Sequence, residues 1–166
     1  MQLATRWGRR TPAQRLVARR LEASTVKSEE LDSYSKPLIG HQLMSVEKKD
    51  YSWFFRFAGD ISVATESPWR LINDDRVVVT SEDHGRQFGL SEPVDAASRL
   101  LSSIVGRTVE AAAISASSGD LTIEFSRRAQ LQLLQMSCGY ESWRLSVRGS
   151  ETICTGGGDI AYFPRR

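Results

Sequence analysis

Glu66-Ser67-Pro68-Trp69-Arg70-Leu71 returns later in the chain as Glu141-Ser142-Trp143-Arg144-Leu145. The segments before the two copies carry apolar residues at corresponding positions: Trp53, Phe55 and Phe57 match Leu121, Ile123 and Phe125, and Ile61 and Val63 match Leu131 and Leu133. Because equal spacing of apolar residues favours equal strands and turns, these matches predict one structural unit that is built twice.

The composition is that of an ordinary globular domain. The chain has 166 residues, of which 40% are hydrophobic and 25% charged, enough for one domain with a core and too short for two large ones. No apolar run approaches the roughly 18 residues of a membrane span, and the N-terminus lacks the apolar stretch of a signal peptide. Two cysteines, Cys138 and Cys154, cannot form a disulfide framework or a zinc site alone. We therefore expect a protein of the reducing cytoplasm.

The first 36 residues form a basic arm that differs from the rest. They hold eight Lys and Arg against four Asp and Glu, whereas residues 37–166 hold 14 against 16. We expect a short helix at residues 13–23 and a polar linker at residues 24–36. The arm could contact nucleic acid or anionic lipid, but a poorly ordered extension is favoured because it lacks interleaved aromatic residues. Nucleic-acid binding by the near-neutral body is not expected.

The remaining residues, 37–166, are expected to form a single domain of short strands. The first unit has runs at residues 42–48, 51–57, 61–65, 69–72 and 76–80, each bounded by Gly, Asp or Asn. In the second unit Trp143 and Leu145 alternate with Arg144, which is the pattern of a sheet with one buried face. Pro68 cannot donate to a strand ladder and predicts an edge position or a bulge.

One helix is predicted between the two units. Pro93 lies at its expected start, Ser91 or Glu92 is the expected cap, and Gly106 is placed to end it. We expect this helix to cover an open sheet face or one end of a barrel. The predicted fold class is α+β: two duplicated antiparallel β-meander units joined by one α-helix, with a poorly ordered or helical N-terminal arm.

Several motifs together resemble a known family. They are Trp69-Arg70-Leu71, the run from Thr80 to Asp95, Gly119-Asp120-Leu121-Thr122, Gly139-Tyr140-Glu141-Ser142-Trp143 and Gly156-Gly157-Gly158. As a set they resemble a family of small bacterial proteins catalogued as a domain of unknown function, over about residues 37–163. The resemblance implies a shared fold and transfers no catalytic residue.

The loop at residues 81–90 is the best candidate for a binding site. It is the densest polar segment between two predicted elements, and loops on rigid scaffolds often carry function. Its candidate partner-binding residues, with the turn before the second tryptophan, are Glu82, Asp83, His84, Arg86, Gln87, Tyr140 and Glu141. A carboxylate beside His84 could form an acid–base pair, but adjacent residues rarely point at one substrate. A plain strand-to-helix connection remains the simplest interpretation.

Other eye-catching residues are more simply structural. The only histidines, His41 and His84, do not have metal-ligand spacing, so no metal and no cofactor is expected. The segment from Gly156 to Asp159 leads into a predicted strand and lacks the lysine of a phosphate loop, so it is interpreted as a turn. The repeated positions of Trp69 and Trp143 favour core anchors over ligand contacts.

The sequence therefore favours a non-catalytic binding module that recognises another protein, in the manner of small immunity or accessory proteins. The alternative is a small-ligand-binding protein or enzyme that uses the loop at Glu82, Asp83 and His84. No catalytic residue is assigned, and no membrane contact is expected.

Overall fold

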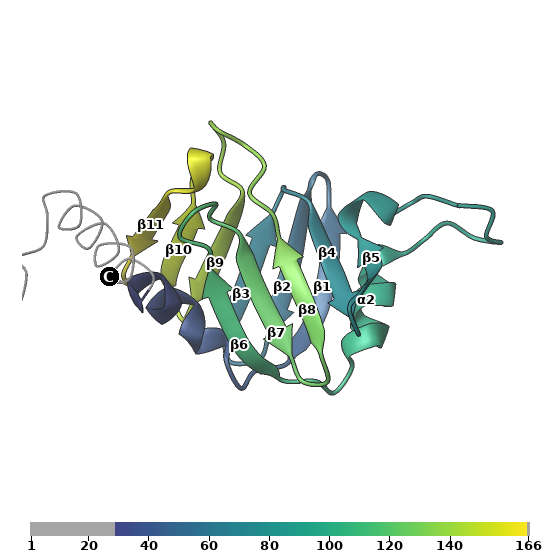
Figure 1. The fold of residues 1–166 in the computed structure, drawn as a ribbon, viewed down its shortest axis with the longest axis horizontal. Coiled ribbons are helices and arrows are strands. Elements are labelled where there is room, and N and C mark those ends of the chain that lie inside the picture. Colours follow the sequence, from purple (N-terminus) through teal and green to yellow (C-terminus); the bar gives the residue numbers. More distant parts are fainter. Residues whose placement is uncertain (1–28, 166) are drawn as a thin grey trace, which may run out of the picture.

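Two antiparallel sheets pack face to face in the computed structural model, which describes residues 29–165 (Figure 1). One sheet has the order β1 (Leu43–Lys49), β2 (Ser52–Phe57), β3 (Ile61–Thr65), β9 (Trp143–Val147), β10 (Ser150–Cys154) and β11 (Ile160–Phe163). The other has the order β5 (Arg76–Thr80), β4 (Trp69–Asn73), β8 (Ala129–Leu133), β7 (Leu121–Phe125) and β6 (Val109–Ile114). The predicted β-rich fold class with two antiparallel units is confirmed.

The two halves of the chain have the same strand order and exchange strands between the sheets. β1, β2 and β3 share a sheet with β9 and β10 through the β3–β9 pairing, and β6, β7 and β8 share a sheet with β4 and β5 through the β8–β4 pairing. Each half thus gives three consecutive strands to one sheet and its next two to the other, and the second half adds β11 at the edge of the six-stranded sheet. Pro68 lies where the chain crosses between the sheets. The predicted edge position is wrong, because β4, which follows Pro68, is an inner strand between β5 and β8.

The core lies between the sheets and contains both repeated tryptophans. Trp69 and Trp143 expose 0% and 1% of their surface, which confirms that they are core anchors. Trp53 and Phe55 of the six-stranded sheet meet Trp69 of the five-stranded sheet edge to face, with ring centroids 4.9 and 5.6 Å apart. Contacts of this kind add specific geometry to the hydrophobic burial that joins the two sheets.

Strand pairing corrects two of the predicted matches between the halves, those of Ile61 and Val63. Ile61 lies opposite Phe57, and Ala129 lies opposite Phe125. Ile61 therefore corresponds to Ala129, and the predicted match of Ile61 to Leu131 is two residues out of step. Alternation alone could not show this, because a shift of two residues keeps every side chain on the same face.

Helix α2 (Ala96–Ile104) closes one open side of the sandwich. It lies against β1 and β5, which are edge strands of different sheets, so it covers neither a sheet face nor a barrel end as expected. Its cap is Asp95 rather than Ser91 or Glu92: one Asp95 carboxylate oxygen accepts from the Ser98 backbone N–H at 3.2 Å, and the other accepts from the Ser98 hydroxyl.

The opposite side of the sandwich is closed by the start of the described chain. Residues 29–35 are helical and continue into the 3₁₀ turn η1 (Lys36–Leu38), where a polar linker was expected. Leu31 and Leu38 are buried, the Ser35 hydroxyl donates to the Ala112 carbonyl of β6 at 2.8 Å, and Tyr34 stacks on Tyr162 of β11. These buried contacts explain why the segment folds onto the body. The helix predicted at residues 13–23 lies outside the described residues.

Candidate functional site

A polar cavity of about 250 Å³ lies beside His84 at one end of the sandwich, and we call it the His84 pocket. It is formed where the end of β1, the β1–β2 turn, the β3–β4 connection and the segment after β5 come together. Its lining residues are Lys48, Tyr51, Trp53, Glu66, Ser67, Ser81, Glu82, His84 and Arg86. Three of the predicted site residues, Glu82, His84 and Arg86, therefore line one cavity.

His84 is fixed in this pocket by the core and by helix α2. Its ring meets the Trp53 ring edge to face at 5.2 Å, and Trp53 in turn meets buried Trp69. Its Nδ1 accepts from the Ala96 backbone N–H at 3.3 Å, at the first turn of α2. A neutral imidazole that accepts at Nδ1 carries its proton on Nε2, so this ring offers the pocket a donor at Nε2.

Asp83 and Gln87, which were also predicted to bind a partner, stabilise the loop itself. Asp83 accepts from the Thr80 backbone N–H at 2.8 Å as half of a capping box. The Gln87 amide donates to the Leu90 carbonyl at 3.0 Å. Both side chains form hydrogen bonds with backbone groups of their own loop, and neither lines the His84 pocket.

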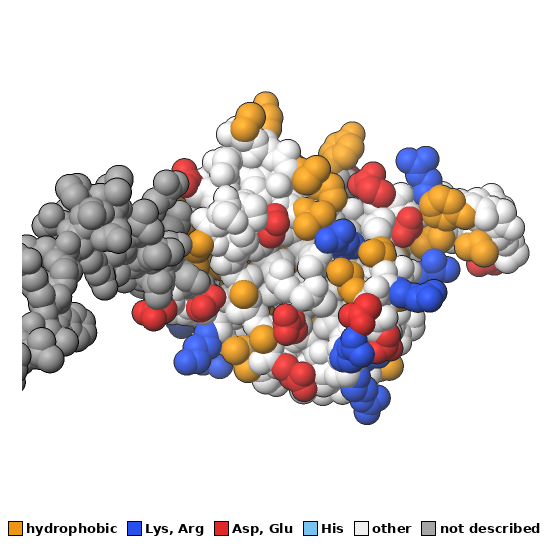
Figure 2. Space-filling model, in the orientation of Figure 1, with side chains coloured by type: hydrophobic (Ala, Val, Ile, Leu, Met, Phe, Trp, Pro, Cys, Tyr) orange, Lys and Arg blue, Asp and Glu red, His pale blue; other side chains and the backbone are white. Residues whose placement is uncertain are grey.

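Beyond the pocket, residues 85–94 project from the body as a narrow loop (Figure 1). Backbone hydrogen bonds of 2.8 Å join Gly85 N–H to Val94 O and Val94 N–H to Arg86 O at its base. Phe88 and Leu90 are exposed near its tip, where Figure 2 shows apolar side chains. Phe88 has a φ of 45°, an uncommon conformation for a bulky residue.

A larger hollow of about 640 Å³ lies on the outer face of the six-stranded sheet, and we call it the Tyr140 groove. Its floor comes from outward side chains of β2, β3, β9 and β10, and one wall comes from the connection between β8 and β9. The lining residues are Ser52, Phe54, Ser62, Ala64, Thr65, Glu66, Tyr140, Glu141, Ser142, Trp143, Arg144, Ser146 and Glu151. Tyr140 and Glu141, the last two predicted site residues, lie here.

An ion-pair cluster stands in this groove. The Arg144 guanidinium contacts both carboxylate oxygens of Glu141 at 3.2 and 3.3 Å and one oxygen of Glu151 at 3.6 Å. The hydrogen bond to Glu141 raises the pKa of Arg144 above its usual value. These side chains are about 40% exposed, so the pairs orient the groups and add little stability.

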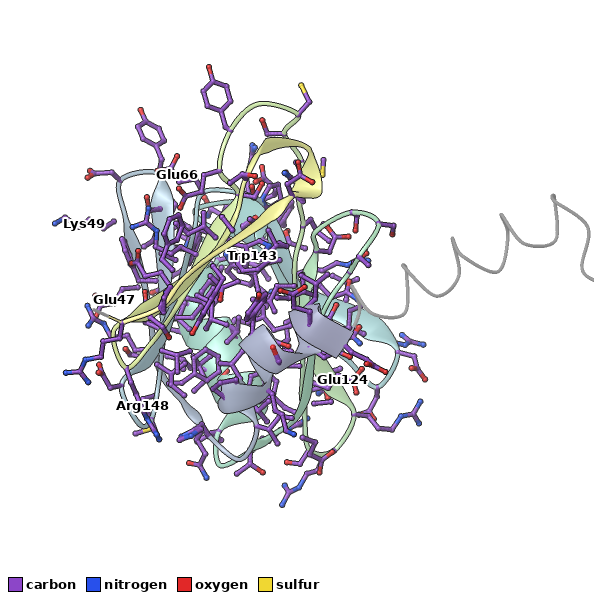
Figure 3. All side chains as sticks on the ribbon, turned by 90° about the vertical axis from the view of Figure 1, so that its left-hand side faces the viewer. Glu47, Lys49, Glu66, Glu124, Trp143 and Arg148 are labelled. Atoms are coloured by element: carbon purple, nitrogen blue, oxygen red, sulfur yellow. The ribbon has the colours of Figure 1, made fainter. Side chains whose placement is uncertain are left out.

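The two cavities meet at Glu66, which lines both. The Ser52 hydroxyl donates to Glu66 Oε1 at 3.0 Å, and Figure 3 shows Glu66 at the end of the sandwich with Trp143 within. Tyr51 beside the pocket is 85% exposed, and Tyr140 beside the groove is 81% exposed. Five of the seven predicted residues, all except Asp83 and Gln87, thus line two separate hollows that adjoin on one surface.

Sequence reasoning missed several residues of this surface, including Tyr51 and Glu66. One signal was present, because Glu66 and Glu141 occupy the same position in the repeated motif. Tyr51, next to the predicted turn at Lys49-Asp50, was assigned to a strand that in fact begins at Ser52. An aromatic residue at the tip of a hairpin has few neighbours to bury it, and this could have marked Tyr51 as exposed.

The surroundings of the two repeated tryptophans, Trp143 and Trp69, differ in hydrogen bonding and packing. Trp143 Nε1 donates to the Gly119 carbonyl at 2.8 Å. Around it, a side chain at Gly156 would come within 2.6 Å of the Gly139 backbone, and one at Gly158 within 2.3 Å of the Ser118 carbonyl. The glycine segment is therefore a tightly packed turn. Within residues 29–165, buried Trp69 Nε1 has no hydrogen-bond partner. The neighbouring Trp53 lines an open cavity.

The two cysteines differ in their exposure to solvent. Cys154 is buried, and burial raises the pKa of its thiol to about 11. Cys138 is exposed and free. Among the described residues, no group of three or more His, Cys, Asp and Glu is placed to hold a metal ion.

Helices that could cross a membrane are missing from residues 29–165, where none is both long and apolar enough.

The model of the family of unknown function DUF6188 matches residues 34–164, so the chain belongs to that family. This confirms the resemblance to an uncharacterised domain. No curated protein and no solved structure matches the chain.

Proposed function

We propose that this member of the DUF6188 family is a non-catalytic protein-binding module of the immunity or accessory type. Its partner would contact the end of the sandwich that carries the His84 pocket and the Tyr140 groove. We also propose a duplicated unit as its origin and the bacterial cytoplasm as its compartment. Matching strand order in the two halves supports the first, and the free thiols of Cys138 and Cys154 support the second.

The observation that carries the proposal is the pair of exposed tyrosines around two adjoining cavities. Tyr51 and Tyr140 come from different connections, and each exposes more than four fifths of its surface. Tyrosine gives a large, rigid contact area with a polar tip at a small cost in conformational entropy. Serines around both hollows add adaptable hydroxyl groups. This combination is typical of surfaces that recognise proteins.

The projecting loop supports the same proposal. Phe88 and Leu90 are held out from the body on a loop whose base is pinned by backbone hydrogen bonds. A solvent-exposed phenylalanine in a strained conformation gains nothing in the isolated chain, whereas insertion into a partner's pocket would bury it. Arg86 belongs to both this loop and the His84 pocket.

Affinity capture with matched variants tests the proposal. Tagged wild-type protein is expected to recover a partner that Tyr51→Ala with Tyr140→Ala loses, and that His84→Ala and Arg86→Ala bind more weakly. Val105→Ala is the control, because Val105 is 79% exposed at the far end of α2 from His84. A partner that all variants retain, or no partner under several growth conditions, would refute this function.

A second candidate function, small-ligand binding in the His84 pocket, is favoured by the difference between the two tryptophan ends. At Trp143 glycine backbone fills the space, whereas beside Trp69 the matching space is bordered by four charged side chains: Lys48, Glu66, Glu82 and Arg86. Titration of a metabolite mixture, followed by the NMR signals of the indole N–H groups, tests it. Trp53 should shift and buried Trp143 should not. Unmoved signals for both would rule this function out.

A further inference from the structure

The floor of the Tyr140 groove is low and polar. Ser62 of β3 lies directly opposite Ser146 of β9, and Ala64 lies opposite Arg144. Larger side chains flank this small-residue floor, among them Phe54 on β2 and Glu151 on β10. Neither the Ser62 nor the Ser146 hydroxyl has a hydrogen-bond partner among the described residues. The floor therefore offers two adjacent hydroxyl oxygens to an occupant.

The charge of the groove selects a cation. Glu66, Glu141 and Glu151 line it, and Arg144 is the only basic residue in its lining. Each carboxylate can accept about four hydrogen bonds, and the bonds from Ser52 and Arg144 leave much of that capacity free. An anionic occupant would meet three carboxylates, whereas a donor-rich cation would find acceptors on the floor and along both walls.

Aromatic faces border the same space. Tyr140 stands at the wall, and Phe54 flanks the floor. A guanidinium group is planar, carries five N–H donors and no acceptor, and stacks on aromatic rings, whereas a lysine ammonium is a compact, strongly hydrated charge. The groove's carboxylates, hydroxyls and rings together suit arginine better than lysine.

We infer that the Tyr140 groove binds an arginine-bearing peptide segment of a partner protein. This assignment rests on the proposed function and names the chemistry of the partner at one of its two cavities. The partner's arginines would reach the carboxylates of Glu66, Glu141 and Glu151, with their guanidinium planes against Tyr140 and Phe54.

Fluorescence anisotropy with the full-length protein and short capped peptides tests the inference. One peptide carries two arginines, and matched peptides carry lysine or citrulline, the neutral isostere of arginine, at the same positions. The arginine peptide should bind several-fold more tightly than the lysine peptide, the citrulline peptide should not bind measurably, and added salt should weaken binding. Equal binding of the arginine and lysine peptides would mean that the groove attracts any positive charge without recognising the guanidinium group, and it would overturn the assignment.

Variants that replace groove carboxylates with neutral amides test whether the peptide binds in the Tyr140 groove. Glu141→Gln with Glu151→Gln removes two acceptors and leaves Arg144 without its partners, so the affinity for the arginine peptide should fall about tenfold. The control is Glu110→Gln with Glu124→Gln, which removes the same charge from exposed positions on the other sheet. A loss as large in the control would overturn the inference, as would unchanged binding in the groove variant.

Two further outcomes separate this inference from the proposed function. If capture recovers a partner that the tyrosine variants lose, but no arginine peptide binds, the protein-binding function stands and the inference fails. The chain's own Arg15, Arg19 and Arg20 are potential competitors. If the peptide binds only after these are replaced with glutamine, the groove belongs to the chain's own arm, and its assignment to a separate partner is overturned.

Discussion

The two buried tryptophans offer a matched test of how the ends of the sandwich are closed. Trp69 and Trp143 hold corresponding places in their halves and are equally buried, but only Trp143 donates a hydrogen bond, to the Gly119 carbonyl. Trp69 Nε1 has no partner within residues 29–165. Replacement of each by phenylalanine keeps an aromatic ring and removes the pyrrole part with its N–H. We expect Trp143→Phe to destabilise the protein more than Trp69→Phe.

The magnitude follows from what the two substitutions share and what they do not. Loss of buried apolar surface costs roughly 1–2 kcal/mol in both variants and cancels in the comparison. Trp143→Phe also leaves the buried Gly119 carbonyl without its donor, which costs about 1–3 kcal/mol. Trp69→Phe removes an unpartnered donor and carries no such cost. The free energy of unfolding should therefore differ between the variants by about 1–3 kcal/mol.

Urea denaturation followed by circular dichroism measures this difference, with equal m-values as the check that both variants unfold from comparable states. The phenylalanine at position 69 should retain most of the edge-to-face contact with Trp53, which near-ultraviolet spectra can confirm. An equal loss of stability in the two variants, or a larger one for Trp69→Phe, would refute the assignment of the Gly119 hydrogen bond as the distinguishing contact.

Three further predictions concern the loops and the helix. Gly158→Ala should cost several kcal/mol more than Gly85→Ala, because both have a positive φ but only a side chain at 158 would meet backbone, at 2.3 Å; equal melting temperatures would contradict this. Cys138 should react rapidly with thiol reagents, whereas Cys154, buried and with its pKa raised to about 11, should react only on unfolding; mass spectrometry of alkylated protein reads both sites. Asp95→Ala should lower the free energy of unfolding by about 1 kcal/mol at neutral pH. Hydrogen bonds from the turn that it caps lower the pKa of Asp95, so its contribution is complete above about pH 3.9 and disappears as the pH falls through the folded-state pKa. Denaturation midpoints of wild type and variant should converge in acid, and a constant gap would contradict the cap.

The features that the sequence predicted well depend on the pattern of residues that are close together in the chain. Alternation around Trp69 and Trp143 predicted their burial, because inward and outward residues follow from the period of a strand. The helix was found from its apolar face, but its cap was misplaced, since Asp95 and the earlier Ser91 are both good caps and only the packing against β1 and β5 decides between them.

The parts of the site that were missed depend on contacts between distant strands. The Tyr140 groove has its small floor only because β3 pairs with β9, which brings Ser62 beside Ser146. His84 lies against Trp53 because the loop after β5 returns to the start of β2. No periodicity encodes either contact. The sequence did hold one clue that Glu66 and Glu141 share a surface, because each begins a copy of the repeated motif.

The exchange of strands between the sheets constrains how the chain can be divided. β3 has its second neighbour in β9, and β4 has one in β8, so cutting between the halves would strip one side from each of these strands. A fragment that ends before β6 would hold a three-stranded and a two-stranded sheet, each with a bare edge of the kind that pairs with another chain. Two such fragments could restore this arrangement, except for β11, by pairing β3 of each copy with β4 of the other about a twofold axis. A gene for one half alone should thus yield a symmetric dimer or an aggregate, never a folded monomer.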